Sequence, residues 1–183
     1  MMMDAIVADK IYTVADYEQL PEGAPYQLID ANLIDRPSPT STHQEIAFKL
    51  TLKLGNFVEK HQLGKVYFAP LDVHLDEHNV FQPDILFIAN DRLHIVKDVV
   101  RGAPDMVIEI LSPATAYYDL ISKKRLYGKH GVSEYWIIDP KEGFVEVYEN
   151  TAGDMQLAQK VEKKGTISSQ VVIKFRLALK DLF

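Results

Sequence analysis

Cysteine is absent from the sequence, which excludes disulfide bonds and thiolate metal sites and is compatible with a reducing cytoplasm. No apolar run approaches the roughly 20 residues that a membrane-spanning helix needs. Residues 1–10 lack the basic and long apolar regions of a signal peptide. We therefore expect a cytoplasmic protein without a membrane partner.

Internal repeats, low-complexity segments and linkers are also missing. The 183 residues are enough for one full hydrophobic core but not for two comfortable ones, so we expect a single domain over 1–183.

Positive charge is in deficit, with a formal net charge of −6. This deficit argues against broad non-specific binding to nucleic acid, but it leaves room for a local basic groove.

Hydrophobic periodicity in the first half of the chain predicts two helices and several strands. Thr13 is a suitable N-cap for the first helix, and the longest helix buries one apolar stripe. The predicted elements are a helix at 14–20, hairpin strands at 26–30 and 32–36, a helix at 43–61, strands at 65–69, 71–76 and 80–88, and a polar connection at 90–101 that can hold a short helix.

The second half of the chain predicts parallel strands joined by a helix, since two buried apolar runs flank an amphipathic segment. The predicted elements are strand 105–111, helix 116–129, strand 134–139 and an antiparallel pair at 144–148 and 155–161. The tail is expected to be buried through Val171, Ile173, Leu177, Leu179, Leu182 and Phe183. The expected class is α/β, with 80–88, 105–111 and 134–139 in one sheet.

Glu109 interrupts an otherwise apolar strand that is bounded by Pro104 and Pro113. Burying a carboxylate is costly unless a cation meets it. One interpretation is a structural ion pair with a lysine or arginine near the strand's end. The other is a metal ligand, and the helix that follows supports it.

Lys123 lies one turn after Leu120 and one turn before Tyr127, so the three share a helix face. If that face meets the sheet, Lys123 points inward, while Lys124 and Arg125 point further round towards solvent. The alternative is a lysine at the edge of the stripe whose head reaches water.

Asp84 follows Pro83 and precedes an apolar strand, so a second carboxylate borders a buried strand. Two acids and Lys123 suit a Mg²⁺ ion, which prefers oxygen ligands, beside a lysine that holds or deprotonates the attacking water.

His43 lies on the buried stripe of the long helix, either as a hydrogen-bonded boundary residue or as a ligand. His74 and His78 lack the further ligands that a zinc site needs.

Several segments together resemble the Uma-two family of restriction endonucleases, within the PD-(D/E)xK nuclease superfamily. The matching pieces are 26–30, Pro39 with His43, Pro83-Asp84, 102–113, Asp119 with Lys123 and Tyr127, 131–140, and Leu182-Phe183. The resemblance implies a restriction-endonuclease-like fold, in which helices flank a mixed sheet, with an N-terminal β-hairpin, a C-terminal antiparallel extension and a metal site at one sheet edge.

The resemblance also implies roles for individual residues in a Mg²⁺- or Mn²⁺-dependent endonuclease that hydrolyses phosphodiester bonds of DNA. The metal ligands are Asp84, Glu109 and the Ile110 carbonyl, the catalytic residues are Asp84, Glu109 and Lys123, and further site-lining residues are Gln27, His43 and Tyr127. A homodimer is a candidate assembly, because cutting both strands of a duplex generally needs two active sites.

The chain departs from the family pattern at three positions. The superfamily lysine two residues after the second acid is Leu111 here, which leaves Lys123 as the relocated lysine. Gln27 stands where the family often has glutamate, and Ala31 stands where it has glycine. The loss of that acid favours an alternative function, a catalytically silent domain of the same fold that binds nucleic acid or protein.

Overall fold

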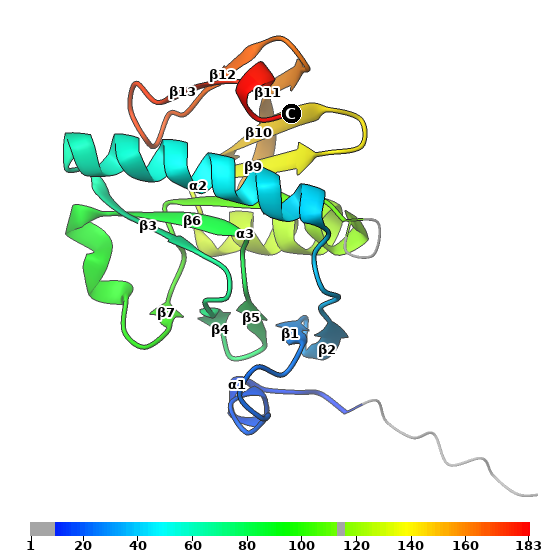
Figure 1. The fold of residues 1–183 in the computed structure, drawn as a ribbon. Helices are drawn as coiled ribbons and strands as arrows, with labels where there is room; N and C mark the ends of the chain where they lie inside the picture. The colour runs from blue at the N-terminus through cyan, green and yellow to red at the C-terminus, as the bar shows by residue number, and fades with distance from the viewer. Residues whose placement is uncertain (1–9, 113–115) are drawn as a thin grey trace, which may run out of the picture.

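A computed structural model describes residues 10–112 and 116–183 of the chain (Figure 1). The elements before the central strand are α1 (Val14–Tyr17), β1 (Tyr26–Ile29), β2 (Asn32–Asp35), α2 (Ser41–His61), β3 (Gly64–Phe68), β4 (Val73–Asp76), β5 (Asn79–Phe81), β6 (Ile85–Ala89), the 3-10 helix η1 (Asn90–Ile95) and β7 (Val100–Arg101). The later elements are β8 (Met106–Ile110), the π-helix η2 (Tyr118–Lys123), α3 (Lys124–His130), β9 (Glu134–Asp139), β10 (Phe144–Thr151), β11 (Asp154–Glu162), β12 (Thr166–Ser168), β13 (Arg176–Ala178) and the 3-10 helix η3 (Leu179–Asp181).

The larger sheet has six strands in the order β11-β10-β9-β8-β6-β3. Strands β8 and β9 pair in parallel, and the other neighbours in this sheet are antiparallel. The segment that joins β8 to β9 contains η2 and α3, because a parallel pair needs a crossover connection. The predicted strand–helix–strand unit is therefore confirmed, although its first helical turns are π-helical rather than α-helical.

Alternate residues of the six-stranded sheet enter two separate cores, since side chains point to opposite faces along a strand. On one face, Ile85, Ile108 and Trp136 pack in a core that also contains the buried residues of α2 and of the C-terminal segment. On the other face, Leu86, Val107 and Tyr135 pack in a core that contains Leu126 and Tyr127 of α3. Figure 1 shows α2 in front of the sheet and α3 behind it.

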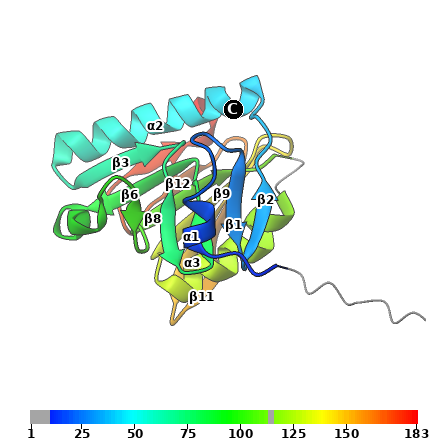
Figure 2. The ribbon, with the colours of Figure 1, turned by 90° about the horizontal axis from the view of Figure 1, so that it is seen from below.

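A five-stranded sheet, ordered β2-β1-β5-β4-β7, lies beside the larger one (Figures 1 and 2). The prediction of one continuous strand over 80–88 was wrong, because β5 belongs to this sheet and β6 to the larger one. Pro83 lies at the break, where a residue without an N–H cannot continue a ladder. Asp84 lies in that break, next to the start of β6.

The predicted N-terminal hairpin is confirmed as β1 paired with β2. Its two turn residues, Asp30 and Ala31, both have positive φ, 47° and 64°. A two-residue turn with positive φ at both positions matches the twist of the flanking strands. The hairpin brings Gln27 of β1, which is 3% exposed, close to β5 and the break after it.

The C-terminal segment packs on the α2 side of the large sheet through five buried residues, Val172, Phe175, Leu177, Leu179 and Leu182. Two of the predicted buried residues are exposed instead, Ile173 by 58% and Phe183 by 38%. Ile173 lies in a turn, where periodicity does not fix which side chain faces the core, and Phe183 is the last residue.

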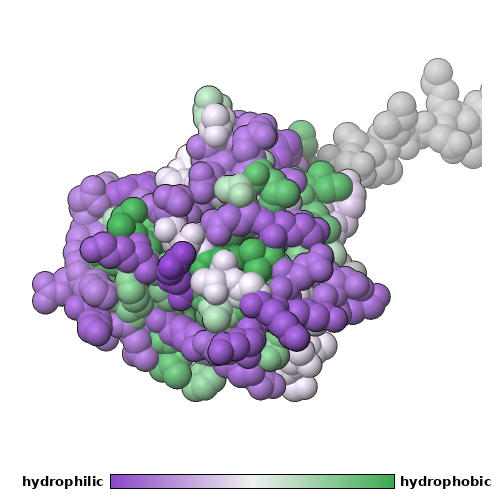
Figure 3. All heavy atoms as spheres, turned by 90° about the horizontal axis from the view of Figure 1, so that it is seen from above, coloured by the Kyte–Doolittle hydropathy of each residue, from purple (hydrophilic) through white to green (hydrophobic). Residues whose placement is uncertain are grey.

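The face seen from above is mostly hydrophilic, with hydrophobic patches between (Figure 3).

The sequence predictions for residues 1–9 and for the break at Pro113 lie outside the described residues. Within the described ranges, every helix is too short or too polar to cross a membrane.

Candidate functional site

Glu109 faces α3 because it alternates with Ile108 and Ile110 on β8, and these two isoleucines enter the α2 core. It is 3% exposed. The Lys123 ammonium donates to Glu109 Oε1 at 2.9 Å, and the Tyr127 hydroxyl donates to the same oxygen at 2.9 Å. The predicted inward direction of Lys123 is confirmed, since it is 3% exposed while Arg125 is exposed.

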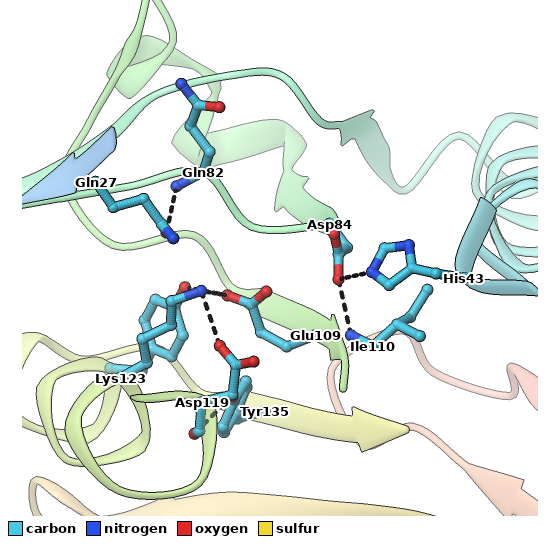
Figure 4. Close-up of polar contacts among 10 residues, drawn as sticks. Gln27, His43, Gln82, Asp84, Glu109, Ile110, Asp119, Lys123 and Tyr135 are labelled. Carbon is cyan, nitrogen blue, oxygen red and sulfur yellow. Dashed lines mark hydrogen bonds and ion pairs between the residues drawn. The ribbon is translucent and has the colours of Figure 1, made fainter. Parts of the chain in front are cut away.

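Asp119 is a site residue that sequence reasoning missed. It is 2% exposed, and its Oδ1 lies 2.9 Å from Lys123 Nζ, so the ammonium lies between two carboxylates (Figure 4). Both residues lie in the π-helical turns, a deviation often found at functional sites. The four-residue spacing between Asp119 and Lys123 was the signal that could have found the pair.

Burial dominates the ionisation of this cluster. It raises the pKa of Glu109 to about 8 against the opposing effect of the Lys123 charge, and the negative charges of Asp119 and Asp84 add to the rise. Burial alone would lower the pKa of Lys123, but Asp119 and Glu109 hold it well above its usual value. The lysine therefore remains charged at neutral pH, while Glu109 holds its proton to a higher pH than an exposed glutamate does.

Asp84 is oriented by two groups that meet the same carboxylate oxygen (Figure 4). The His43 ring Nε2 lies 3.1 Å from Asp84 Oδ2, and the Ile110 backbone N–H donates to Oδ2 at 2.8 Å. Burial lowers the pKa of His43, but the hydrogen bond and charge of Asp84 reverse this and leave the pKa raised. Asp84 is thus tied to the start of α2 and to the end of β8.

A polar pocket of about 90 Å³ brings the predicted residues together. Its lining includes Gln27, His43, Asp84, Glu109, Ile110 and Lys123, together with Asp119, Arg36 and Gln82, which the sequence did not single out as site residues. Tyr127 is fully buried behind the pocket and reaches it only through Glu109. Gln27 Oε1 accepts a hydrogen bond from the Gln82 backbone N–H at 3.2 Å, so a neutral amide stands at the position of the family glutamate.

Two carboxylates, Asp84 and Glu109, are the predicted metal ligands that line this pocket. Among the residues that the structure describes, no three histidine, aspartate or glutamate side chains form a preformed metal-binding group. Two carboxylates still fit Mg²⁺, which keeps several waters and binds through one or two acids. The role of the Ile110 carbonyl stays a prediction.

A solved structure and a family of known proteins match this chain, whereas the curated proteins do not. A crystal structure described as "a putative nuclease belonging to DUF820", from Anabaena variabilis, is similar with a TM-score of 0.81 and 25% identity, over 93% of this chain and 97% of that one. The predicted α/β fold, with mixed sheets flanked by helices, is thereby confirmed. The family described as "Uma2: Putative restriction endonuclease" matches residues 14–180, and the chain belongs to this family.

Proposed function

We propose that this protein is a divalent-metal-dependent nuclease that hydrolyses phosphodiester bonds of DNA. The observation that carries the proposal is the Lys123–Glu109 contact of 2.9 Å in a pocket that Asp84 also lines. Buried acids and a lysine that line one cleft and have perturbed pKa values mark a candidate catalytic site. Membership of the Uma2 family supports the same activity.

Asp84 and Glu109 would hold Mg²⁺ or Mn²⁺ in this proposal. A metal ion at these carboxylates supplies positive charge for the scissile phosphate and for the charge that develops on it. The raised pKa of Glu109 fits this role. Burial favours the protonated form of this side chain in the metal-free protein, and a bound cation would supply the nearby positive charge that stabilises the carboxylate. Asp84 needs no rearrangement of its orientation, since His43 and Ile110 already fix it.

Lys123 would position the attacking water and the phosphate rather than remove a proton. Its pKa is raised by two neighbouring carboxylates, and an ammonium that stays charged is a poor general base. It can donate up to three hydrogen bonds, and the structure shows two partners, Glu109 and Asp119. Asp119 then acts as a positioning residue that fixes the direction of the lysine.

A catalytically silent domain that binds nucleic acid or protein is the second candidate. The neutral Gln27 and the tight Asp119–Lys123–Glu109 cluster favour it, because a charge cluster that satisfies itself can serve structure alone. The two candidates differ in whether phosphodiester bonds are cut.

The decisive experiment is a cleavage assay on plasmid DNA, single-stranded DNA and RNA, with Mg²⁺ or Mn²⁺ and with a chelator as the blank. The wild type is expected to cut DNA only with metal, and Glu109→Ala to lose that activity. Lys124→Ala is the control, because Lys124 is outside the pocket lining and instead places its ammonium 4.6 Å from the centre of the Tyr148 ring. A wild type that cuts none of the substrates with either metal would contradict the proposal and favour the silent domain.

A further inference from the structure

A second pocket, about 290 Å³ in volume, lies between α2 and the end of β3. It adjoins the polar pocket of the candidate site. Three of its lining residues are large, apolar and exposed: Phe48 by 67%, Leu52 by 51% and Phe68 by 62%. Phe48 and Leu52 are four residues apart on α2, so they form one ridge of the helix, and Phe68 faces them from β3. We call the two aromatic residues, Phe48 and Phe68, the aromatic ridge; Leu52 lies beside them.

The pocket beside the aromatic ridge is continuous with the candidate active site. His43, Gln44, Ala69 and Asp84 line both pockets. A ligand group in the second pocket therefore lies next to whatever Asp84 binds in the first. For a phosphodiester at the first pocket, the neighbouring group of the same ligand is a sugar with its base.

Polar groups lie where the two pockets meet. His43 contacts Asp84 through Nε2, and its Nδ1 is buried, so its ring lines the junction without offering a free hydrogen-bonding atom to a ligand. Gln44, one residue further along α2, is exposed and carries both a donor and an acceptor. The Gln44 amide can therefore offer hydrogen bonds to the edge of a planar heterocycle whose faces would contact Phe48 or Phe68.

We propose that this pocket binds a nucleobase adjacent to the scissile phosphate, stacked on the aromatic ridge. The inference rests on the proposed nuclease function and deepens it. A base within a duplex is stacked between its neighbours and enters such a pocket only when it is flipped out, at the cost of unstacking and unpairing it, so we expect the site to prefer a single strand or an unpaired base. Stacking on aromatic side chains is tolerant of sequence, since every base has a π-face.

A second copy of the chain is the competing occupant, because β3 is an edge strand of the six-stranded sheet and its Phe68 is exposed. A stable protein interface covers about 800 Å² on each partner. A pocket of about 290 Å³ suits a single ring system instead, close to the lower end of the volumes found for small-ligand sites. The shared lining with the active site also favours a part of the substrate.

The test uses the full-length protein and oligonucleotides that carry a fluorescent adenine analogue, either single-stranded or in a perfect duplex, with a chelator to prevent cleavage. Stacking on Phe48 or Phe68 is expected to quench the single-stranded probe on binding. Phe48→Ala and Phe68→Ala should each weaken its binding by roughly tenfold to a hundredfold and remove the quenching. Phe48→Trp should retain both, whereas Phe48→Leu, which keeps apolar surface without a ring, should not.

Leu157→Ala is the matched control, because Leu157 is 52% exposed on β11, at the opposite edge of the same sheet. All of these side chains are exposed, so their loss is expected to leave the fold intact, which a melting curve checks. A wild type whose binding does not quench the probe overturns the inference. So do ridge variants that bind like Leu157→Ala, or that only convert a dimer to a monomer in sedimentation.

Cleavage assays separate this inference from the proposed nuclease function. Cutting that prefers unpaired DNA and loses this preference in Phe48→Ala supports both. Equal cutting of single strands and duplex by wild type and Phe48→Ala keeps the nuclease and overturns the base pocket. Ridge-dependent quenching with no cleavage by the wild type supports the pocket and contradicts the nuclease.

Discussion

Strand β8 separates two regions that differ in what they bury. On the α2 side, Met106, Ile108 and Ile110 pack with Leu50 and Leu54 in a core of apolar side chains. On the α3 side, Val107 joins an apolar core, but the next residue on that face is Glu109, which contacts the buried Lys123, and the lysine in turn contacts Asp119. One strand thus serves two environments through its alternation.

The difference indicates which side contributes stability and which side carries chemistry. Apolar burial stabilises by about 25 cal/mol per Å², with no requirement for partners. A buried ion pair often contributes no more than a well-packed apolar substitute, so its presence needs another explanation. We infer that the α2 side holds the strand in place and that the α3 side uses this rigidity to position Glu109, Lys123 and Asp119.

Lys123→Ala is expected to have the largest effect. Loss of the positioned ammonium should lower turnover by roughly 10²–10³-fold, as for the loss of one positioned hydrogen-bond donor, and the two carboxylates left buried should destabilise the fold by about 3–5 kcal/mol. Single-turnover cleavage at a temperature where the variant is folded measures the first effect, and denaturant unfolding the second. Lys124→Ala should change turnover little. A dead Lys124→Ala beside an active Lys123→Ala would mean that the wrong lysine has been assigned.

Leu50→Ala tests the other side of β8. Leu50 is fully buried in the α2 core, so the truncation should lower the free energy of unfolding by about 2–5 kcal/mol. Turnover per folded molecule should stay near that of the wild type, because no atom of the pocket changes. Urea unfolding and cleavage measured on the same preparation provide both numbers. A variant that stays fully stable but loses cleavage would erase the distinction between the two sides.

Glu109→Gln tests the charged side of β8 through the pH dependence of stability. An acid whose pKa is raised from 4.5 to about 8 in the folded state binds more protons folded than unfolded, so its contribution to stability is present below pH 4.5 and is lost as the pH rises to about 8. The metal-free wild type should therefore lose stability over this window relative to Glu109→Gln, which does not titrate. Melting curves between these two pH values test the prediction. A constant difference between the two proteins would contradict it.

The sequence predicted the central features because they depend on local pattern. Glu109 stood out in an apolar run, and the stripe of Leu120 and Tyr127 placed Lys123 inward, as the structure confirms. The hairpin 26–36 and the parallel pair were also predictable, since turn chemistry and crossover length are local properties. Asp119 carried its signal in its spacing from Lys123, but the π-helical turns that bury it with the lysine had no signature in the pattern.

Other features depended on tertiary arrangement and were not predictable. The split of 80–88 between two sheets follows from strand pairing at a distance, although Pro83 hinted at an interruption. The aromatic ridge is invisible in the sequence, because Phe48 and Phe68 acquire a common pocket only when α2 and β3 pack together. Exposure of Ile173 likewise depends on how the C-terminal turn docks.

The proposed metal site at Asp84 is tested most directly by the effect of Mn²⁺ on thermal unfolding of the wild type and of Asp84→Ala. A cation that binds only the folded state stabilises it by about 2.7 kcal/mol at a hundred times its dissociation constant. Millimolar Mn²⁺ is therefore expected to raise the melting temperature of the wild type by several degrees, and that of Asp84→Ala much less. Asp91→Ala, which removes an acid from η1 instead, is the control and should respond like the wild type. Equal shifts in the wild type and Asp84→Ala would contradict a metal site at Asp84.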